Sequence, residues 1–395
     1  CNLVTGEVLK LASSAYGAFP ATHTPDHKRV ILADSYTTGD DVIYLWEEAN
    51  PTRRLIFGTP LEERKPGQEL PFYGLGSFEF IEGCNGLLMT TALYEDTFSP
   101  VYLDLDRPGE LKRISISGLV HTGSGELVGI GHLRDKRYTI EFNIDGVSWL
   151  YEVELDIETY QFKVVHVLCG QGELSDGMLE SVHYDKSSDR IVMTFSTATS
   201  PTQIYTRGGT KRDELVRHTN ERVLGVDSAL LSKGEDASFT SFDGLRVSAR
   251  LYLPAAELNF KGPRPVVYYI HGGPQGQERP DFAWFSMPLI QFLTLNGFAV
   301  FVPNVRGSTG YGLSYTKRVD RDWGGQDRLD HVHAMKLLGQ DKRVDTSRAA
   351  VVGRSYGGYM TLTLAGRHPE LWKASCDMFG PYDLLTFLDR IPSTW

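Results

Sequence analysis

One serine in the chain has the neighbours that make a hydroxyl nucleophilic. Gly353, Ser355 and Gly357 are spaced two residues apart, between an apolar run at 349–352 and a helical stretch at 356–367. A serine on a tight strand-to-helix turn is forced into strained backbone geometry, and its hydroxyl stands clear of the sheet edge. The glycines lack Cβ atoms, so strand and helix can pass closely. We predict that Ser355 is a nucleophile; the alternative is a glycine-rich turn with an incidental serine.

The backbone donors that such a nucleophile needs can also be located. The first N–H groups of a helix point toward the turn that precedes it, so the N–H of Tyr356 would face a developing oxyanion. The segment H-G-G-P at 271–274 directly follows an apolar run at 265–270. A second oxyanion donor is expected at this place in α/β-hydrolases, and we choose Gly273 for it. A preorganised donor of this kind lowers a barrier by about 3–4 kcal/mol.

A second polar loop, at 304–312, follows the apolar run at 298–303. Its Arg306 could bind a carboxylate or carbonyl of a substrate, or it could pair with an acid such as Asp327 or Asp330. We favour the structural ion pair and keep substrate binding as the alternative. No metal site and no cofactor is predicted, because the histidines of the N-terminal part share no metal-ligand spacing. They are His121, His132, His166 and His183.

The base that should activate the serine is not found in the sequence. A serine nucleophile needs a histidine held by a carboxylate, and in α/β-hydrolases both follow the serine along the chain. The one later histidine, His368, ends the same helix. It lies roughly 20 Å from the serine, far beyond the ~3 Å of a proton transfer. His271 has a backbone-based loop role. The remaining acids, which have no histidine to orient, are Asp377, Asp383 and Asp389.

The elements that must position these loops lie in residues 235–395. A hairpin is predicted at 239–253 around the strong turn pair Asp243-Gly244. Apolar runs without alternation predict strands buried on both faces, as parallel sheets require, at 265–270, 298–303, 349–352 and 374–379. Helices are predicted between or after them at 284–296, 326–338 and 356–367. The pattern predicts an open, mostly parallel sheet with helices on both faces.

Residues 1–234 instead alternate short β-rich runs with turn clusters. Typical runs lie at 29–33, 42–46, 86–92, 163–167 and 190–195. Turn-then-strand units recur at 24–33, 82–92, 123–131 and 185–194, a period of roughly 40–55 residues that suits propeller blades. A complete propeller has ~4–8 blades, so four such units would form an incomplete ring if the complete ring has more than four. The alternative is a β-sandwich or two stacked small sheets.

Composition limits the classes of protein to consider. The chain has 395 residues and a net charge of −10, which argues against a nucleic-acid partner. No run of ~18 apolar residues is present, so no membrane span is predicted. The cysteines are scattered and form no C-x-x-C motif, which favours a reducing compartment and a cytoplasmic location. They are Cys1, Cys84, Cys169 and Cys376. Homo-oligomer formation is left open.

Four motifs occur in a fixed order and together resemble the prolyl oligopeptidase family of serine peptidases. They are H-G-G-P at 271–274, R-G-S-T-G-Y-G at 306–312, W-G-G-Q-D at 323–327 and G-R-S-Y-G-G-Y at 353–359. The resemblance is closest to the acylaminoacyl-peptidase-like branch. It is strong over 239–395 and only compositional over 1–234. It implies that a propeller precedes the hydrolase and admits only short peptides, that Ser355 is the nucleophile and that Tyr356 supplies an oxyanion N–H.

The sequence therefore predicts an incomplete β-propeller at 1–234 and an α/β-hydrolase domain at 235–395 whose C-terminal part is missing. We expect a serine peptidase that cleaves short peptides through an acyl-enzyme on Ser355. The start at Cys1 and the abrupt end at Trp395 favour a piece of a longer peptidase over a short protein with a dead site. The chain by itself is expected to be inactive. Alternatives are an esterase of the same fold and a propeller-based peptide-binding protein with a vestigial hydrolase.

Overall fold

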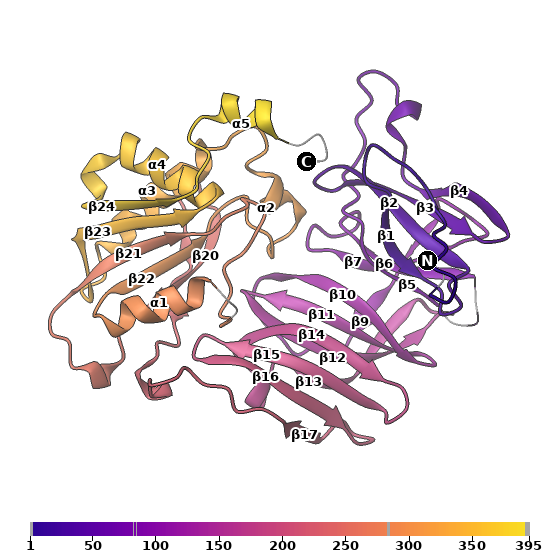
Figure 1. Ribbon diagram of the computed structural model, residues 1–395, viewed down its shortest axis with the longest axis horizontal. Coiled ribbons are helices and arrows are strands. Elements are labelled where there is room, and N and C mark those ends of the chain that lie inside the picture. Colours follow the sequence, from indigo (N-terminus) through magenta and orange to yellow (C-terminus); the bar gives the residue numbers. More distant parts are fainter. Residues whose placement is uncertain (1–2, 82, 84, 283–284, 392–395) are drawn as a thin grey trace.

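The computed structural model describes residues 3–81, 83, 85–282 and 285–391. It consists of a β-rich part and an α/β part that lie side by side (Figure 1). Five residues on which predictions rested lie outside the described residues: Cys1, Glu82, Cys84, Trp284 and Trp395. Of the remaining cysteines, Cys169 is buried, Cys376 is exposed and both are free thiols. None of the described helices is long and apolar enough to cross a membrane.

The β-rich part forms four separate sheets, drawn in indigo to magenta in Figure 1. The first contains β1 (Phe19–His23), β2 (Arg29–Thr37), β3 (Asp40–Glu47) and β4 (Asn50–Phe57). The second contains β5 (Gly76–Phe80), β6 (Gly86–Thr91), β7 (Ser99–Asp104) and β8 (Leu111–Arg113). The third contains β9 (Ser115–Ser117), β10 (Gly125–Arg134), β11 (Arg137–Ile144), β12 (Val147–Asp156) and β13 (Gln161–Cys169). The fourth contains β14 (Gly177–Asp185), β15 (Arg190–Thr197), β16 (Ser200–Gly208) and β17 (Glu214–Arg217).

These sheets pack as blades, with one apolar core between each neighbouring pair. Ile43 and Leu45 of the first sheet share a core with Leu87 and Leu103 of the second. Leu88 of the second sheet packs into the core of the third. Leu150, Leu168 and Cys169 of the third sheet pack against the fourth at Leu179, Ile191 and Met193. Successive blades that bury facing surfaces define a propeller and not a sandwich of two sheets.

The predicted strands of this part are confirmed. Each of the five runs singled out above lies within a strand or overlaps nearly all of one: β2, β3, β6, β13 and β15. The four turn-then-strand units fall one in each sheet, so the weak sequence repeat marks the blades. The short 3-10 turns among them are Leu61–Glu63, Gly172–Leu174 and Ser228–Leu230.

The α/β part is built on one seven-stranded sheet with the order β18-β20-β22-β21-β23-β24, and β19 pairs with β20. The strands are β18 (Glu235–Asp236), β19 (Phe239–Thr240), β20 (Arg246–Tyr252), β21 (Arg264–Ile270), β22 (Ala299–Asn304), β23 (Val344–Arg354) and β24 (Ala374–Met378). The neighbours β22, β21, β23 and β24 are parallel, whereas β20 runs antiparallel to β22. The hairpin and the mostly parallel sheet are as predicted.

Helices cover both faces of this sheet. They are α1 (Ser286–Leu295), α2 (Leu313–Lys317), α3 (Gln326–Leu338), α4 (Tyr356–Arg367) and α5 (Leu384–Arg390), with 3-10 turns at Ala256–Leu258 and Pro369–Leu371. Helices α3 and α4 share a core with Tyr268 and Phe301, whereas α1 packs on the opposite face with Tyr269 and Val300. The predicted helices correspond to α1, α3 and α4. The short α2 and α5 were not predicted, because neither is long enough for a helical repeat of apolar residues.

Strand β24 departs from the prediction of a strand buried on both faces. Its first four residues, Ala374 to Asp377, are exposed, although the strand pairs with β23 in parallel register. Phe379, which was included in the predicted strand, has a φ of 49° and is 73% exposed. The reason is position, since β24 lies at the edge of the sheet among the described residues. An apolar run alone does not distinguish an edge strand from a central one.

The propeller contacts the hydrolase at the loops that follow its parallel strands. Glu126 of β10 accepts hydrogen bonds from the N–H groups of Gly310 and Gly312, at 3.1 and 2.8 Å. Asn143 of β11 donates to Gln277 at 2.6 Å. These loops follow β21 and β22, at the same sheet edge as the turn after β23. The propeller therefore lies over the edge where ligands of open α/β sheets bind.

Candidate active site

Ser355 occupies the turn between β23 and α4 in the strained conformation that the sequence predicts. Its backbone angles are φ 56° and ψ −119°, a combination unfavourable for a residue with a Cβ atom. The serine is exposed, whereas the residue after it, Tyr356, is buried. The hydroxyl is thus presented at the end of a rigid strand, as a nucleophile requires.

The two glycines of the motif are required by close backbone approach. A Cβ atom added to Gly353 would lie 2.2 Å from the carbonyl oxygen of Gly357. One added to Gly357 would lie 2.1 Å from the carbonyl oxygen of Ile270, at the end of the neighbouring strand β21. Both distances are far below a van der Waals contact, so larger residues at either position would force the turn apart.

The H-G-G-P loop after β21 lies directly against this turn. A Cβ atom on Gly272 would be 3.2 Å from the Cβ atom of Ser355 and 3.0 Å from the carbonyl oxygen of Arg354. The next residue, Gly273, has a φ of 128°, which few other residues adopt. The structure therefore brings together two of the predicted components, the serine turn and the glycine loop. That the N–H groups of Gly273 and Tyr356 bind an oxyanion remains a prediction.

Both ring nitrogens of His271 contact atoms of the loops at this edge. Its Nδ1 lies 2.8 Å from the carbonyl oxygen of Gly272, and its Nε2 lies 3.0 Å from the Oγ of Ser308. The side chain is buried, and burial lowers the pKa of His271. Both ring nitrogens are therefore occupied by loop atoms, which agrees with the predicted backbone-based role of this segment.

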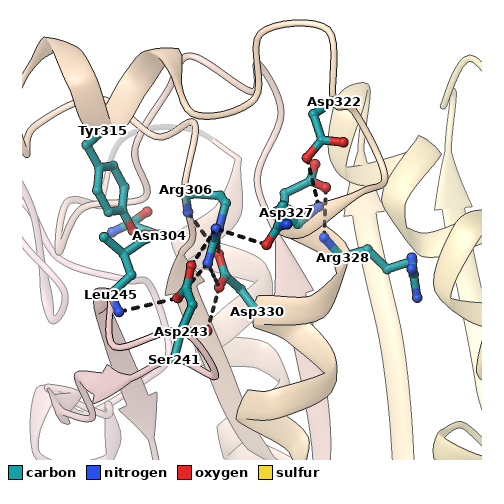
Figure 2. Close-up of polar contacts among 11 residues, drawn as sticks. Ser241, Asp243, Leu245, Asn304, Arg306, Tyr315, Asp322, Asp327, Arg328 and Asp330 are labelled. Atoms are coloured by element: carbon teal, nitrogen blue, oxygen red, sulfur yellow. Dashed lines mark hydrogen bonds and ion pairs between the residues drawn. The ribbon is translucent and has the colours of Figure 1, made fainter.

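Arg306 is held by two carboxylates, as the favoured alternative predicted. Its Nε and its Nη2 donate to the two oxygens of Asp330 at 2.8 and 2.7 Å, and a second ion pair joins its Nη1 to Asp243 at 3.0 Å (Figure 2). Asp330 also accepts from the hydroxyl of Ser241 at 2.5 Å. Arg306 is 3% exposed. A substrate group could reach this guanidinium only by displacing protein carboxylates.

The other acid considered for Arg306, Asp327, has a different partner. Its Oδ2 accepts a hydrogen bond from the hydroxyl of Tyr356, the residue after the serine. It also accepts from the N–H of Gly324 at 3.2 Å and from that of Arg328 at 2.8 Å. Burial raises the pKa of Asp327 to about 6. Sequence reasoning missed this contact, although the W-G-G-Q-D motif that contains Asp327 had been noted.

Three of the candidate acids and bases that follow Ser355 have structural partners of their own: His368, Asp377 and Asp383. His368 lies at the other end of α4, where its Nε2 contacts Arg328 at 2.5 Å. Asp377 accepts from the N–H of Gly380 at 2.8 Å, and Asp383 caps α5. Asp389 lies in α5. Within the described part of the chain, no histidine or carboxylate is hydrogen-bonded to the Ser355 hydroxyl, and no cluster of three or more histidine, cysteine or acidic residues could hold a metal ion.

The fold and the strained serine turn together define a class of protein, a propeller joined to an α/β-hydrolase. Comparison with solved structures supports this class. A puromycin-hydrolyzing peptidase from Mycobacterium tuberculosis superimposes with a TM-score of 0.72 at 19% identity, covering 95% of this chain and 55% of its own. An acylaminoacyl peptidase in complex with a chloromethyl ketone superimposes with a TM-score of 0.62, also at 19% identity, covering 92% of this chain and 52% of its own.

Sequence comparison specifies the family. Residues 283–395 match the model of the prolyl oligopeptidase family, the family that the motifs resemble. The dipeptidyl aminopeptidase BIII of Pseudoxanthomonas mexicana is 32% identical over 160 residues, which are 39% of this chain and 23% of that protein. The human acylamino-acid-releasing enzyme is 34% identical over 133 residues, 34% of this chain and 18% of that protein. The chain spans about half the length of the solved structures that it matches.

Proposed function

We propose that this protein acts as a serine peptidase on short peptides, through an acyl-enzyme formed on Ser355. The observation that carries the proposal is the serine turn itself: Ser355 is strained and exposed, and the glycine loop lies so close that a Cβ atom added to Gly272 would be 3.2 Å from the Cβ atom of Ser355. In this mechanism the serine oxygen attacks the scissile carbonyl, and the N–H groups of Tyr356 and Gly273 stabilise the oxyanion. Departure of the amine leaves an ester on Ser355, which water then hydrolyses.

The domain assignment belongs to the same proposal. Residues 1–234 would form the propeller and residues 235–395 the catalytic domain. Because Glu126 and Asn143 hold the loops at the catalytic edge, the propeller would limit access to short, flexible peptides. Relatives are named dipeptidyl peptidases and an acylamino-acid-releasing enzyme, so we propose that a peptide with a free or an acylated amino end is the substrate. A cytoplasmic location is proposed from the scattered cysteines, and no cofactor is required.

The need for proton transfer limits the rate at which residues 1–395 alone could hydrolyse peptides. The hydroxyl proton of Ser355 must pass to a base during attack, and no described residue is placed to receive it. We therefore propose that these residues need a histidine and a carboxylate from outside the described part before they turn over peptides efficiently. Without them, we expect at most the slow rate that an oxyanion site supports.

The test combines active-site labelling with turnover. The protein is isolated from its natural source, with any residues that it carries besides 1–395, and is called the native protein below. It is treated with a fluorophosphonate, and the labelled residue is located by peptide mass spectrometry. Hydrolysis of dipeptidyl and N-acetylaminoacyl p-nitroanilides is then measured. We expect the label on Ser355 and loss of labelling and turnover in Ser355→Ala. An unlabelled native protein that still binds peptides would favour a propeller-based binding protein. Cleavage of p-nitrophenyl esters but of no peptide would favour an esterase.

A further inference from the structure

The W-G-G-Q-D segment at 323–327 holds the beginning of the nucleophile's helix from one side. The indole ring of Trp323 meets the ring of Tyr356 edge to face, with 4.9 Å between ring centroids. One turn further along α4, the hydroxyl of Tyr359 donates to the carbonyl oxygen of Trp323 at 3.1 Å. A Cβ atom on Gly324 would lie 2.5 Å from that hydroxyl, so the close approach depends on a glycine.

Asp327 completes this contact at the residue beside the nucleophile. Its carboxylate accepts a hydrogen bond from the hydroxyl of Tyr356. Both side chains are buried, since Asp327 is 0% and Tyr356 is 3% exposed. Two backbone N–H groups, from Gly324 and Arg328, hold the carboxylate in place. A buried phenol whose hydroxyl and ring both have partners has little freedom to move. The side chain of Tyr356 is therefore fixed at its far end, and its backbone is fixed in the first turn of α4.

We propose that Asp327 is a positioning residue for the reaction at Ser355. This inference rests on the proposed function, in which the N–H of Tyr356 binds the oxyanion. A strained turn such as that of Ser355 persists only when its surroundings over-determine it. The Tyr356–Asp327 hydrogen bond is one such restraint, and it acts on the residue that carries the donor. Oxyanion donors must be placed within about 0.5 Å, so a looser turn lowers the rate without abolishing binding.

Two variants test the proposal in the native protein. Tyr356→Phe removes only the hydroxyl, and Asp327→Asn replaces one carboxylate oxygen by an amide donor. The substrate is whichever p-nitroanilide, dipeptidyl or N-acetylaminoacyl, the wild type cleaves. We expect each variant to lower kcat toward it by about 10- to 100-fold and to change KM by less than about twofold, because the lost restraint acts in the transition state. The double variant should be no slower than the worse single variant, since both remove the same hydrogen bond.

Tyr268→Phe is the matched control. Its hydroxyl is also buried, 3.0 Å from the Nδ1 of His331, but Tyr268 lies within strand β21 and packs in the core that this strand shares with α3 and α4, not at the serine turn. The control should lose thermal stability while keeping kcat. If Asp327→Asn does not fold, Tyr356→Phe alone tests the positioning role, because this substitution preserves the aromatic ring and its volume.

Each outcome has one meaning. A wild-type kcat in Tyr356→Phe, an equal loss in Tyr268→Phe, or additive losses in the double variant would overturn the positioning role while leaving the peptidase proposal intact. Parallel changes in kcat and KM would also overturn it, since they indicate general loosening of the site. Absence of fluorophosphonate labelling of wild-type Ser355 would instead overturn the proposed function, and the inference with it.

Discussion

Two buried arginines, one in each half of the molecule, have nearly the same surroundings. Arg212 lies between β16 and β17 of the propeller, and Arg306 follows β22 of the hydrolase; each is 3% exposed. Arg212 pairs with the buried Glu152 at 2.8 Å and with Asp189, whose side chain is 31% exposed, at 2.9 Å. Arg306 pairs with the buried Asp330 at 2.7 Å and with the 33%-exposed Asp243 at 3.0 Å.

The ion-pair clusters of Arg212 and Arg306 differ in the parts of the molecule that they join. Glu152 belongs to the third blade, whereas Asp189 and Arg212 belong to turns of the fourth, so the propeller cluster links two blades. Asp330 lies on α3, one turn beyond Asp327, so the hydrolase cluster holds the loop after β22 at the catalytic edge. The same ionic chemistry serves stability in one place and the geometry of a reaction edge in the other. The tests below separate these two roles.

The largest effects are expected from removing the arginines. Arg306→Ala removes the arginine paired with the buried Asp330, and Arg212→Ala leaves the buried Glu152 with only the more distant Arg137, at 3.7 Å. Breaking a buried ion pair in this way costs about 3–5 kcal/mol. Hydrogen–deuterium exchange in increasing urea should place the loss in residues 1–234 for Arg212→Ala and in residues 235–395 for Arg306→Ala. Only Arg306→Ala should slow fluorophosphonate labelling of Ser355 per folded molecule. Equal labelling rates in the two variants would show that the Arg306 cluster has no special influence on the serine turn.

A partly buried carboxyl group, Glu278, has a serine hydroxyl as its hydrogen-bond partner. It accepts from the hydroxyl of Ser286, and burial raises the pKa of Glu278 to about 7. The folded state therefore holds this proton more tightly than the unfolded state does. Its contribution to stability is complete below pH ~4.5 and is lost as the pH rises through 7, by about 3 kcal/mol in total.

Glu278→Gln keeps the hydrogen-bond acceptor and removes the titration. The free energy of unfolding, measured in urea at several pH values, should fall between pH 5 and pH 8 by about 2–3 kcal/mol more in the wild type than in the variant. A parallel pH dependence of the two proteins would contradict the assignment.

The smallest effects are expected from the half-exposed partners. Asp189→Asn and Asp243→Asn leave each arginine with its buried carboxylate, and ion pairs open to water contribute only about 0–1 kcal/mol. Urea denaturation should therefore place both variants within about 1 kcal/mol of the wild type. A loss comparable to that of the arginine variants would mean that the outer carboxylate, and not the buried one, dominates each cluster.

Sequence reasoning recovered the elements that depend on local pattern. The strands of the blades follow from β-rich runs bounded by turn residues, and the parallel sheet follows from apolar runs without alternation. The turn at Ser355 follows from glycine spacing, because no other residue fits positions where a Cβ would meet backbone at 2.1 to 2.2 Å. The exposure of β24 and the short helices α2 and α5 were not recovered, since apolar content does not report the position of a strand or the presence of one helical turn.

By itself, then, the sequence determined two halves of different architecture, the nucleophile candidate and the glycine loop beside it. Only the tertiary structure decided the partners of the polar side chains. It joined Arg306 to Asp330 and Asp243, and it joined Asp327 to Tyr356, residues separated by 24 to 63 positions in the chain. The physical reason is that backbone conformation responds to neighbouring residue types, whereas a hydrogen bond between distant side chains depends on how whole elements pack.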